Sequence, residues 1–368
     1  MKTAIIGCGN ISTQYLERAP AFGVLDIVRV ADLDADRARA QAEKYGVPRH
    51  GSVDDVVSDA DVELVINLTI PAAHAPIALR CIDAGKHVYG EKPLAVTREE
   101  ASSMLDAAKA QGVRVGNAPD TFLGTGHQAA RKLIDDGAIG TPTAAMGFMV
   151  CPGHESWHPD PEFYYAPGGG PMLDMGPYYL TALINLLGPI DRVSAEAGIQ
   201  INPRTITSEK KNGKVVQVAT PDHVATNLRF AGGAIGTVVT SFAGHQATHD
   251  TTRPITIYGT KGTLKVGDPN GFDTAPMLYT TGQTGGGDGD DYAEAATPHA
   301  HPNGRSLGAA DMALAIKAGR PHRASGELSR SVLDIMLATL ESSERGEYIT
   351  IDSAGVERPS MMDVAGMA

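Results

Sequence analysis

The stretch Thr3-Ala4-Ile5-Ile6-Gly7-Cys8-Gly9-Asn10-Ile11-Ser12 decides the fold of this chain. Thr3–Ile6 is a run typical of a buried strand, and Gly7 and Gly9 then permit a tight turn into a helix. Such a turn lets backbone N–H groups approach a pyrophosphate. The stretch matches the dinucleotide-binding fingerprint GxGxxG at its first two glycines, with Ser12 at the third. That position serves close helix–strand packing, which serine nearly matches.

Strand and helix signals alternate over the first 120 residues. After Thr3–Ile6, candidate strands follow at Asp26–Ala31, Val62–Leu68, Lys86–Tyr89 and Val113–Gly116. The helices between them have cap signals at Asp34, Ser52 with Asp55, and Thr97 with Glu100, and glycine stops at Gly46, Gly85 and Gly112. This alternation predicts an α/β fold whose first domain, residues 1–120, is a Rossmann domain with a doubly wound parallel sheet.

The pattern changes after Ala118, and we assign residues 121–368 to a second, substrate-binding and oligomerisation domain. Its candidate strands are longer and joined by tight turns: Thr143–Val150, Arg192–Gln200, His223–Phe230, Ala234–Phe242, Pro254–Gly259 and Gly262–Val266. Helices are expected at residues 126–136, 172–187, 309–318 and 328–346. This predicts an α/β domain with a mostly antiparallel sheet. We expect a mobile loop over residues 282–291 and a frayed tail from Gly355.

Composition limits the classes of partner. The 368 residues carry a net charge of −12, which argues against binding to nucleic acid or an anionic membrane surface. No apolar run is long enough to cross a bilayer, and no signal peptide is evident at the N-terminus. Three widely spaced cysteines, Cys8, Cys81 and Cys151, are typical of reduced thiols. We therefore expect a cytoplasmic protein.

Candidate cofactor contacts lie at the carboxyl ends of the predicted strands. Asp32 ends the second strand, where an aspartate accepts hydrogen bonds from the adenine ribose and repels a 2′-phosphate. This favours NAD over NADP. Thr69 and Pro71 follow the strand at Val62–Leu68 and are further candidates, whereas His74 is as readily a structural histidine.

A lysine follows the next predicted strand, in the sequence Glu91-Lys92-Pro93. Since this position lies at the same edge of the sheet, its ammonium can act on an alcohol or carbonyl oxygen beside the bound cofactor. The glycine turn and Lys92 together indicate a nicotinamide-dependent oxidoreductase.

Several blocks of sequence resemble the family of glucose–fructose oxidoreductase and myo-inositol dehydrogenase (the Gfo/Idh/MocA family). They are Gly7–Ile11, Ala84–Val88 with Glu91–Pro93, Ile134–Gly140, Gly168–Gly176 and Gly319–Pro321. The resemblance spans nearly the whole chain. It implies a Rossmann domain followed by an α/β domain with a large open-faced sheet, through which members form homodimers or homotetramers.

The resemblance also implies roles for particular residues. Together with the strand-end candidates named above, the cofactor-binding positions that we predict are Gly7, Gly9, Asn10, Ile11, Asp32, Thr69, Pro71, His74, Glu91 and Lys92. Lys92 is the residue that acts on the substrate oxygen, the following Pro93 is often cis, and Asp174 is a catalytic or substrate-binding carboxylate. Most members have a histidine four residues later as acid/base, whereas this chain has Tyr178.

Tyr178 leaves the proton carrier open. On a helix it shares a face with Asp174, four residues earlier. A phenol is too weakly acidic to be an efficient base at neutral pH, but a nearby ammonium such as that of Lys92 favours the phenolate. We therefore assign Tyr178 to catalysis, with a simple hydrogen bond to a substrate hydroxyl as the equal alternative.

The segment from Cys151 to Tyr165 holds the single tryptophan, Trp157, together with His154 and His158. Aromatic rings stack on sugar rings and imidazoles bind hydroxyls, so we predict a substrate loop containing Trp157 and His158. His158 is also an alternative acid/base. A metal site built from both histidines with Glu155 or Asp160 is a minority interpretation, and we predict no metal.

The primary hypothesis is reversible hydride transfer between NAD and a secondary alcohol or ketone of a sugar, polyol or glycoside. Lys92, Asp174 and Tyr178 are the catalytic candidates, and Asp120, Trp157 and His158 are further substrate contacts. Sub-patterns such as Asp174–Tyr179 resemble a branch linked to trehalose and other glycosides. The alternatives are an NAD-retaining glycoside hydrolase or lyase and a non-catalytic regulator. The sequence leaves the substrate, reaction direction and subunit count open.

Overall fold

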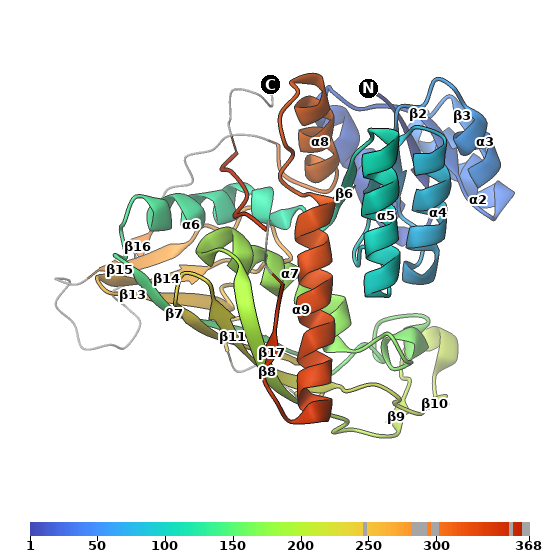
Figure 1. Ribbon diagram of the computed structural model, residues 1–368. Helices are drawn as coiled ribbons and strands as arrows, with labels where there is room; N and C mark the ends of the chain where they lie inside the picture. Colours follow the sequence, from blue (N-terminus) through green and yellow to red (C-terminus); the bar gives the residue numbers. More distant parts are fainter. Residues whose placement is uncertain (246–248, 281–292, 296–301, 353–355, 363–368) are drawn as a thin grey trace. The chain divides into compact units, whose positions relative to one another are not determined.

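The computed structural model describes residues 1–245, 249–280, 293–295, 302–352 and 356–362. The chain divides into two compact units (Figure 1). Unit 1 comprises residues 1–124, 299–333 and 359–368, and unit 2 comprises residues 125–298 and 334–358. The loop expected at residues 282–291 lies outside the described residues.

Unit 1 is built on a six-stranded sheet in the order β3-β2-β1-β4-β5-β6, in which every pairing is parallel. The strands are β1 (Lys2–Ile6), β2 (Asp26–Ala31), β3 (Arg49–Gly51), β4 (Leu64–Asn67), β5 (His87–Gly90) and β6 (Val115–Asn117). The helices are α1 (Asn10–Arg18), α2 (Ala35–Tyr45), α3 (Val53–Ser58), α4 (Pro71–Asp83), α5 (Arg98–Gln111) and α8 (Leu307–Lys317), with 3₁₀ turns η1 (Ala19–Phe22) and η2 (Thr121–Leu123). The predicted doubly wound parallel sheet is confirmed.

The predicted cap residues Asp34, Ser52 and Thr97 all cap their helices, but only one of the two predicted capping boxes is complete. Asp34 accepts hydrogen bonds from the N–H groups of Asp36 and Arg37, and Ser52 forms a complete capping box with Asp55. Thr97 caps α5 through the N–H of Glu100, but the Glu100 carboxylate binds the N–H of Val96 instead of completing a box. Gly46 and Gly112 end their helices with φ of 67° each, a left-handed conformation suited to glycine.

Unit 1 also includes residues 299–333, which the sequence analysis assigned to the second domain. Two interactions explain the difference: Asn117 of β6 donates its N–H to the carbonyl of Ala324, and Gly116 forms a β-bridge with Ser325. The Met312 side chain of α8 lies against Gly116, where a Cβ would come within 2.8 Å of its sulfur. These are contacts between distant parts of the sequence, which local patterns do not reveal.

Unit 2 contains a nine-stranded sheet in the order β16-β15-β14-β13-β7-β12-β11-β8-β17. The strands are β7 (Pro142–Val150), β8 (Ile190–Gly198), β11 (His223–Phe230), β12 (Ile235–Ser241), β13 (Ile255–Gly259), β14 (Gly262–Val266), β15 (Met277–Thr280), β16 (Ala293–Glu294) and β17 (Ile349–Thr350). Only β7 and β12 pair in parallel among these described strands, so the expected mostly antiparallel sheet is confirmed. A small separate sheet pairs β9 (Arg204–Thr205) with β10 (Val215–Val216).

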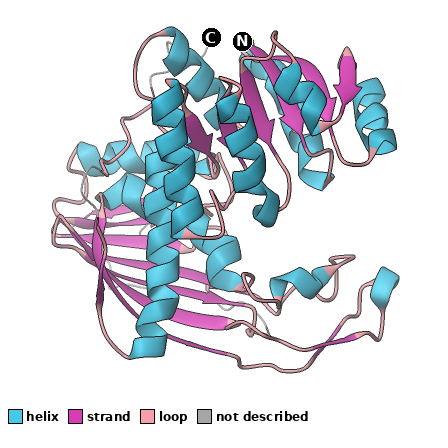
Figure 2. Cartoon of the chain, turned by 45° about the vertical axis from the view of Figure 1, so that its right-hand side comes forward, coloured by secondary structure: helices cyan, strands magenta, loops and turns pink. Residues whose placement is uncertain are grey.

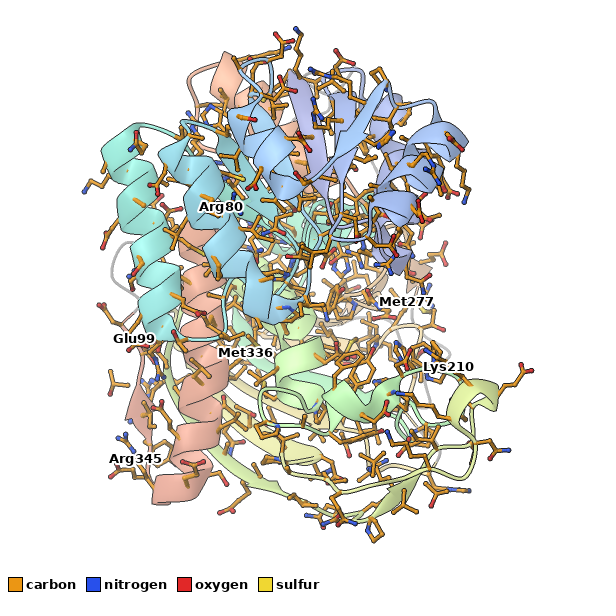
Figure 3. All side chains as sticks on the ribbon, turned by 90° about the vertical axis from the view of Figure 1, so that its right-hand side faces the viewer. Arg80, Glu99, Lys210, Met277, Met336 and Arg345 are labelled. Atoms are coloured by element: carbon orange, nitrogen blue, oxygen red, sulfur yellow. The ribbon has the colours of Figure 1, made fainter. Side chains whose placement is uncertain are left out.

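Helices cover one face of the large sheet (Figure 2). They are α6 (Thr125–Asp135) and α7 (Pro171–Leu187), and the unit also holds the C-terminal part of α9 (Gly326–Arg345) and 3₁₀ turns η3 (Pro161–Tyr164) and η4 (Glu209–Lys211). Met336 of α9, labelled in Figure 3, lies against Gly176 of α7. The other face of the sheet exposes Met146, Ile235 and Tyr258.

The tail is better anchored than expected over its described residues. Arg358 donates hydrogen bonds to the carbonyls of Asn185 and Leu186, and Arg323 binds the carbonyls of Ser360 and Met361. The buried Arg323 holds the backbone of this segment, and the partly buried Arg358 of the segment binds the end of α7, so its lack of apolar periodicity predicts fraying wrongly for residues 356–362.

Candidate active site

The glycine turn connects β1 to α1, and each of its small residues has a distinct spatial reason. Gly7 has φ of 98°, and a Cβ there would come within 2.7 Å of the Leu68 backbone. At Gly9, by contrast, a Cβ would meet no described atom within 4 Å. Ser12 is fully buried, and its hydroxyl donates to the Gly9 carbonyl (2.6 Å). Gly7 and Ser12 thus serve packing, whereas Gly9 leaves open space in front of the α1 N-terminus.

Asp32 lies beside this turn, at the end of β2. Its Oδ2 accepts the N–H of Cys8 (2.7 Å), and its Oδ1 accepts the N–H of Asp34 (2.9 Å). The Arg37 guanidinium, which the sequence analysis did not consider, lies 3.4 Å from Oδ1. A carboxylate has about four lone-pair sites, so acceptor capacity remains for ribose hydroxyls. Burial raises the pKa of Cys8 to about 12, helped by the Asp32 charge, and this thiol is therefore inert.

The loop from β4 to α4 carries Thr69, Pro71 and His74. The Thr69 hydroxyl donates to Asn67 Oδ1 (2.7 Å), and Pro71 is exposed at the first position of α4. His74 is buried, with Nδ1 2.6 Å from the Pro93 carbonyl and Nε2 3.0 Å from the Thr69 carbonyl. Since both ring nitrogens face protein carbonyls, His74 ties two loops together instead of offering a nitrogen to the cofactor.

Lys92 follows β5 in a segment fixed on both sides. The Glu91 carboxylate accepts the hydroxyl of Tyr15 (2.8 Å) and the backbone N–H of Lys92 (3.0 Å). Asn117 donates to the Glu91 carbonyl (2.8 Å). The Lys92–Pro93 peptide bond is cis, as the resemblance implied. Glu91 is buried and acts here by holding the backbone of Lys92.

Asp120 does not offer the substrate contact that was expected of it. Its side chain is 0% exposed, lies 3.3 Å from the guanidinium of Arg305, and accepts the N–H of Gly308 (3.1 Å). Burial raises the pKa of this carboxyl, opposed by Arg305. The geometry gives Asp120 a structural role, joining residues 299–333 to the sheet of unit 1.

In unit 2, three consecutive glycines lead into α7. Gly168 and Gly170 have φ of 85° and 88°, and a Cβ on Gly169 would come within 2.5 Å of the Phe163 carbonyl oxygen. This turn places Asp174 in the first turn of α7, with Tyr178 one turn later on the same helix face. Asp174 is partly exposed, and Tyr178 is buried.

The segment 151–165 brings its aromatic rings together. His154 packs against Tyr164, Phe242 and Trp157, with ring centroids 4.1, 4.5 and 5.2 Å away. Trp157 is 61% exposed, as a ring that stacks on a ligand requires. His154 Nε2 lies 3.8 Å from Asp174 Oδ2.

One ring nitrogen of His158, the histidine favoured from the sequence, is already hydrogen-bonded to a neighbouring residue. Its Nδ1 accepts the N–H of Asp160 (3.0 Å). Burial and the neighbouring His154 lower the pKa of His158.

The two carboxylates considered as metal ligands are engaged elsewhere. Glu155 binds Arg204 (2.8 Å), and Asp160 pairs with Lys211 and with Lys210, labelled in Figure 3. Within the described residues, no group of three or more His, Cys, Asp or Glu side chains could hold a metal ion.

Two sequence models of one family match most of the chain. Residues 1–118 match the model "Oxidoreductase family, NAD-binding Rossmann fold", and residues 127–265 match the model "GFO/IDH/MocA C-terminal domain". The chain belongs to the Gfo/Idh/MocA oxidoreductase family.

Individual Gfo/Idh/MocA relatives are more distant. An inositol 2-dehydrogenase from Salmonella typhimurium is 33% identical over 153 residues, which cover 40% of this chain and 45% of the relative. A levoglucosan dehydrogenase from Pseudarthrobacter phenanthrenivorans is 28% identical over 309 residues, covering 78% and 75%. The solved structure of a levoglucosan dehydrogenase in complex with NADH has a TM-score of 0.80 at 23% identity, covering 95% of this chain and 99% of that one. The last likeness concerns the fold alone.

The family model that matches residues 1–118 is described as NAD-binding, and the residues of unit 1 fit that cofactor. The space left beside Gly9 and the N–H groups at the α1 N-terminus suit a pyrophosphate, since the first turn of that helix carries no acidic residue. Asp32 then lies at the end of the neighbouring strand, where the ribose of a dinucleotide is bound in such folds.

Sequence reasoning missed the residues that shape the segment 151–165 of this family member. Arg204 is 3% exposed and binds Glu155, the fully buried Asp222 (2.7 Å) and the carbonyl of Phe242 (2.8 Å). Its guanidinium also lies over the Tyr165 ring, 4.8 Å from the centroid. The only signal was a lone arginine after Asn202-Pro203, and its partners lie 18 to 49 residues away.

Among the described residues, no helix is long and apolar enough to cross a membrane.

Proposed function

We propose that this protein catalyses reversible hydride transfer between a nicotinamide dinucleotide, NAD in preference to NADP, and a secondary alcohol or ketone of a sugar, polyol or glycoside. One observation carries the proposal: Lys92 and the glycine turn lie at the carboxyl edge of the same parallel sheet. Only β4 separates β1 from β5, so the two strands run roughly 10 Å apart. That edge is where doubly wound sheets bind their ligands.

The cofactor, when bound, accepts or donates the hydride. Lys92 polarises the substrate oxygen and stabilises the alkoxide charge that develops on it. Its backbone is held by the Glu91 carboxylate, and the Pro93 carbonyl by His74. Asp174 orients the substrate, and Tyr178 on the same helix face hydrogen-bonds or exchanges the hydroxyl proton.

The substrate class is supported by the relatives and by one exposed ring. The relatives are named for inositol and levoglucosan, a polyol and a sugar derivative. Trp157 offers an exposed indole face, and such faces stack on the apolar faces of sugar rings. His158 completes this proposed contact surface.

The preference for NAD rests on Asp32. Its carboxylate would repel a 2′-phosphate while accepting the 2′-hydroxyl of NAD. Arg37, 3.4 Å from Asp32 Oδ1, neutralises part of that charge. We therefore propose that NAD is favoured and NADP is a weaker cofactor.

We also propose a homodimer or homotetramer formed through the open sheet face that exposes Met146, Ile235 and Tyr258. Apolar faces of this kind commonly mark interfaces. Light scattering on the purified protein gives the subunit count, and a monomer at all concentrations contradicts this part. The described cysteines are all free, which supports a reducing, cytoplasmic location.

The test is a screen of sugars, inositols and glycosides with NAD and NADP, read by the absorbance of the reduced cofactor. On the substrate found, Lys92→Ala is expected to keep NAD affinity within about 2-fold and to lower kcat about 100-fold or more. Lys109→Ala, an exposed lysine on α5, is the matched control and keeps full activity.

Full activity of Lys92→Ala would contradict the proposed role of this lysine. Release of free sugar from a glycoside with no net NADH would instead assign the NAD-retaining hydrolase or lyase reaction. NAD binding with no turnover of any substrate class would leave a regulator.

A further inference from the structure

His154 holds a position in unit 2 that no sequence motif assigned to it. The imidazole is 12% exposed and is enclosed by the rings of Tyr164, Phe242 and Trp157. Its Nε2 lies 3.8 Å from Oδ2 of Asp174, whose side chain is 20% exposed. The ring is therefore fixed by packing while one nitrogen faces the carboxylate.

The backbone of His154 is fixed as well. Its N–H donates to the hydroxyl of Tyr165 (3.1 Å), and its carbonyl accepts the N–H of His158 (3.0 Å). The next residue, Glu155, binds the buried Arg204 and accepts the N–H groups of Thr207 and Ser208 at its carbonyl. The turn that presents the imidazole is thus anchored on several sides.

Nε2 of His154 is buried and lacks a hydrogen-bond partner among the described residues. Buried polar atoms are almost always bonded, so such an atom calls for an explanation. The 3.8 Å from Nε2 to Asp174 Oδ2 is slightly longer than a hydrogen bond. The arrangement suits a pair that forms and breaks a hydrogen bond as a proton moves.

We propose that His154 is a positioning residue that works through Asp174, holding the proton that Asp174 receives during alcohol oxidation. This rests on the proposed function. The substrate hydroxyl gives up its proton as its carbon gives up a hydride, with two electrons, to the nicotinamide. The proton passes to the Asp174 carboxylate, then to His154 Nε2, and finally to water, and the reverse sequence serves ketone reduction. Tyr178 then has the first of its two proposed roles, a hydrogen bond to the substrate hydroxyl.

The charges around His154 come from each element packed against it. Asp174 on α7 and Glu155 beside it are acidic, but Glu155 is neutralised by Arg204. The segment itself adds His158, the phenols of Tyr164 and Tyr165, and the Cys151 thiol, whose pKa burial raises. Phe242 is uncharged. Of these groups, Asp174 is the one whose carboxylate oxygen lies 3.8 Å from His154 Nε2.

Nuclear magnetic resonance of ¹⁵N-histidine-labelled protein tests the pair without substrate or cofactor. The Nε2 signal of His154 is assigned by its loss in His154→Gln. At about pH 6, where an imidazole exchanges its proton, Asp174→Asn is expected to move that signal toward its neutral-imidazole position. Glu162→Gln is the matched control, because this carboxylate of the same segment binds Lys211 and Lys214 instead.

An Nε2 signal that is the same in Asp174→Asn as in the parent overturns the pairing. An equal movement in Glu162→Gln also overturns it, since the effect would then be one of overall charge. Because neither measurement needs turnover, the pairing is judged even if no sugar is oxidised.

The pH–rate profile tests the role in proton transfer. We expect the rate of alcohol oxidation to fall at acidic pH, where a protonated imidazole no longer accepts the proton. His154→Gln should lower kcat/KM on the order of 10- to 100-fold and remove that fall between roughly pH 5 and 8. Glu162→Gln should keep both the rate and the profile.

A His154→Gln profile of unchanged shape, with an unchanged melting temperature, contradicts the proton role even if the rate falls. Loss of the acidic limb in His158→Gln but not in His154→Gln would assign the role to His158. Both outcomes differ from failure of the proposed function, in which the parent protein oxidises no substrate.

Discussion

The predicted cofactor edge of unit 1 and the segment 151–165 of unit 2 are held by different kinds of interaction. At the cofactor edge, Asp32 accepts two backbone N–H groups, and Glu91 accepts the N–H of Lys92. In the segment 151–165, main-chain hydrogen bonds such as those that the Glu155 carbonyl accepts from Thr207 and Ser208 are joined by the buried guanidinium of Arg204 and by stacked rings.

The difference teaches how each region tolerates change. At the cofactor edge the carboxylates of Asp32 and Glu91 bond neutral backbone N–H groups, so substitution of one of them leaves no buried charge without its partner. A buried ion pair depends on every partner, since loss of one leaves an uncompensated charge. We therefore expect loss of a buried ion-pair partner of the segment 151–165 to lower the free energy of unfolding more than substitutions at the cofactor edge. This is so although the segment carries the proposed substrate loop.

The largest expected effect comes from Arg204→Met. It leaves the fully buried Asp222 and the nearly buried Glu155 without their cation, at an expected cost of about 3–5 kcal/mol in the free energy of unfolding. Urea denaturation measures it. Lys214→Met removes a half-exposed partner of Glu162 and should cost less than about 1 kcal/mol. Equal effects of the two variants would contradict the claim that the buried ion pairs of Arg204 make this segment easy to destabilise.

The buried His127 of unit 2 should make the free energy of unfolding depend on pH. Burial lowers its pKa from 6.5 to about 4, partly opposed by the carbonyls of Asp268 and Gly271. Between these values the unfolded chain binds the extra proton, so stability is fully present above pH 6.5 and is lost as pH falls toward 4. The loss amounts to roughly 3 kcal/mol.

Urea denaturation at pH 7 and pH 4.5 measures this loss, and His127→Gln should flatten the dependence. Because the pKa values of His87, His158 and His322 are also lowered by burial, some dependence in the same direction remains. A slope that His127→Gln leaves unaltered would rule out this histidine as a source.

The smallest expected effects come from two variants of the glycine turn, one of which should mainly change NAD affinity and the other mainly the free energy of unfolding. Gly9→Ala should change unfolding by less than about 1 kcal/mol, because its Cβ meets no described atom, but should weaken NAD about 10-fold by filling the space beside α1. Gly7→Ala should destabilise by about 1–3 kcal/mol, since φ is 98° and the Leu68 backbone is too close. Calorimetric titration with NAD and urea denaturation give both quantities. Identical behaviour of the two variants would refute their separate roles.

Local patterns predicted what depends on neighbours in sequence. The turn at Gly7, the caps at Asp34 and Ser52, and the strands that alternate with helices all rest on residues within a few positions of one another. The three-residue strand β3 was missed because Arg49–Gly51 has no apolar pattern. The placement of residues 299–333 was missed because Asp120 meets Arg305 across 185 positions.

By itself, the sequence determined a Rossmann domain followed by a sheet domain, the family, and a lysine after β5, because strand periods, glycine turns and short motifs are local properties. Only the tertiary structure decided that Asp120 and His74 are internal ties, that Arg204 holds the segment 151–165, and that His154 faces Asp174. Each of these residues meets a partner 18 to 185 positions away, and which partners meet depends on the packed core. These pairings arise because charged groups and aromatic rings are buried together and must find partners there, and no local sequence pattern specifies which partners they meet.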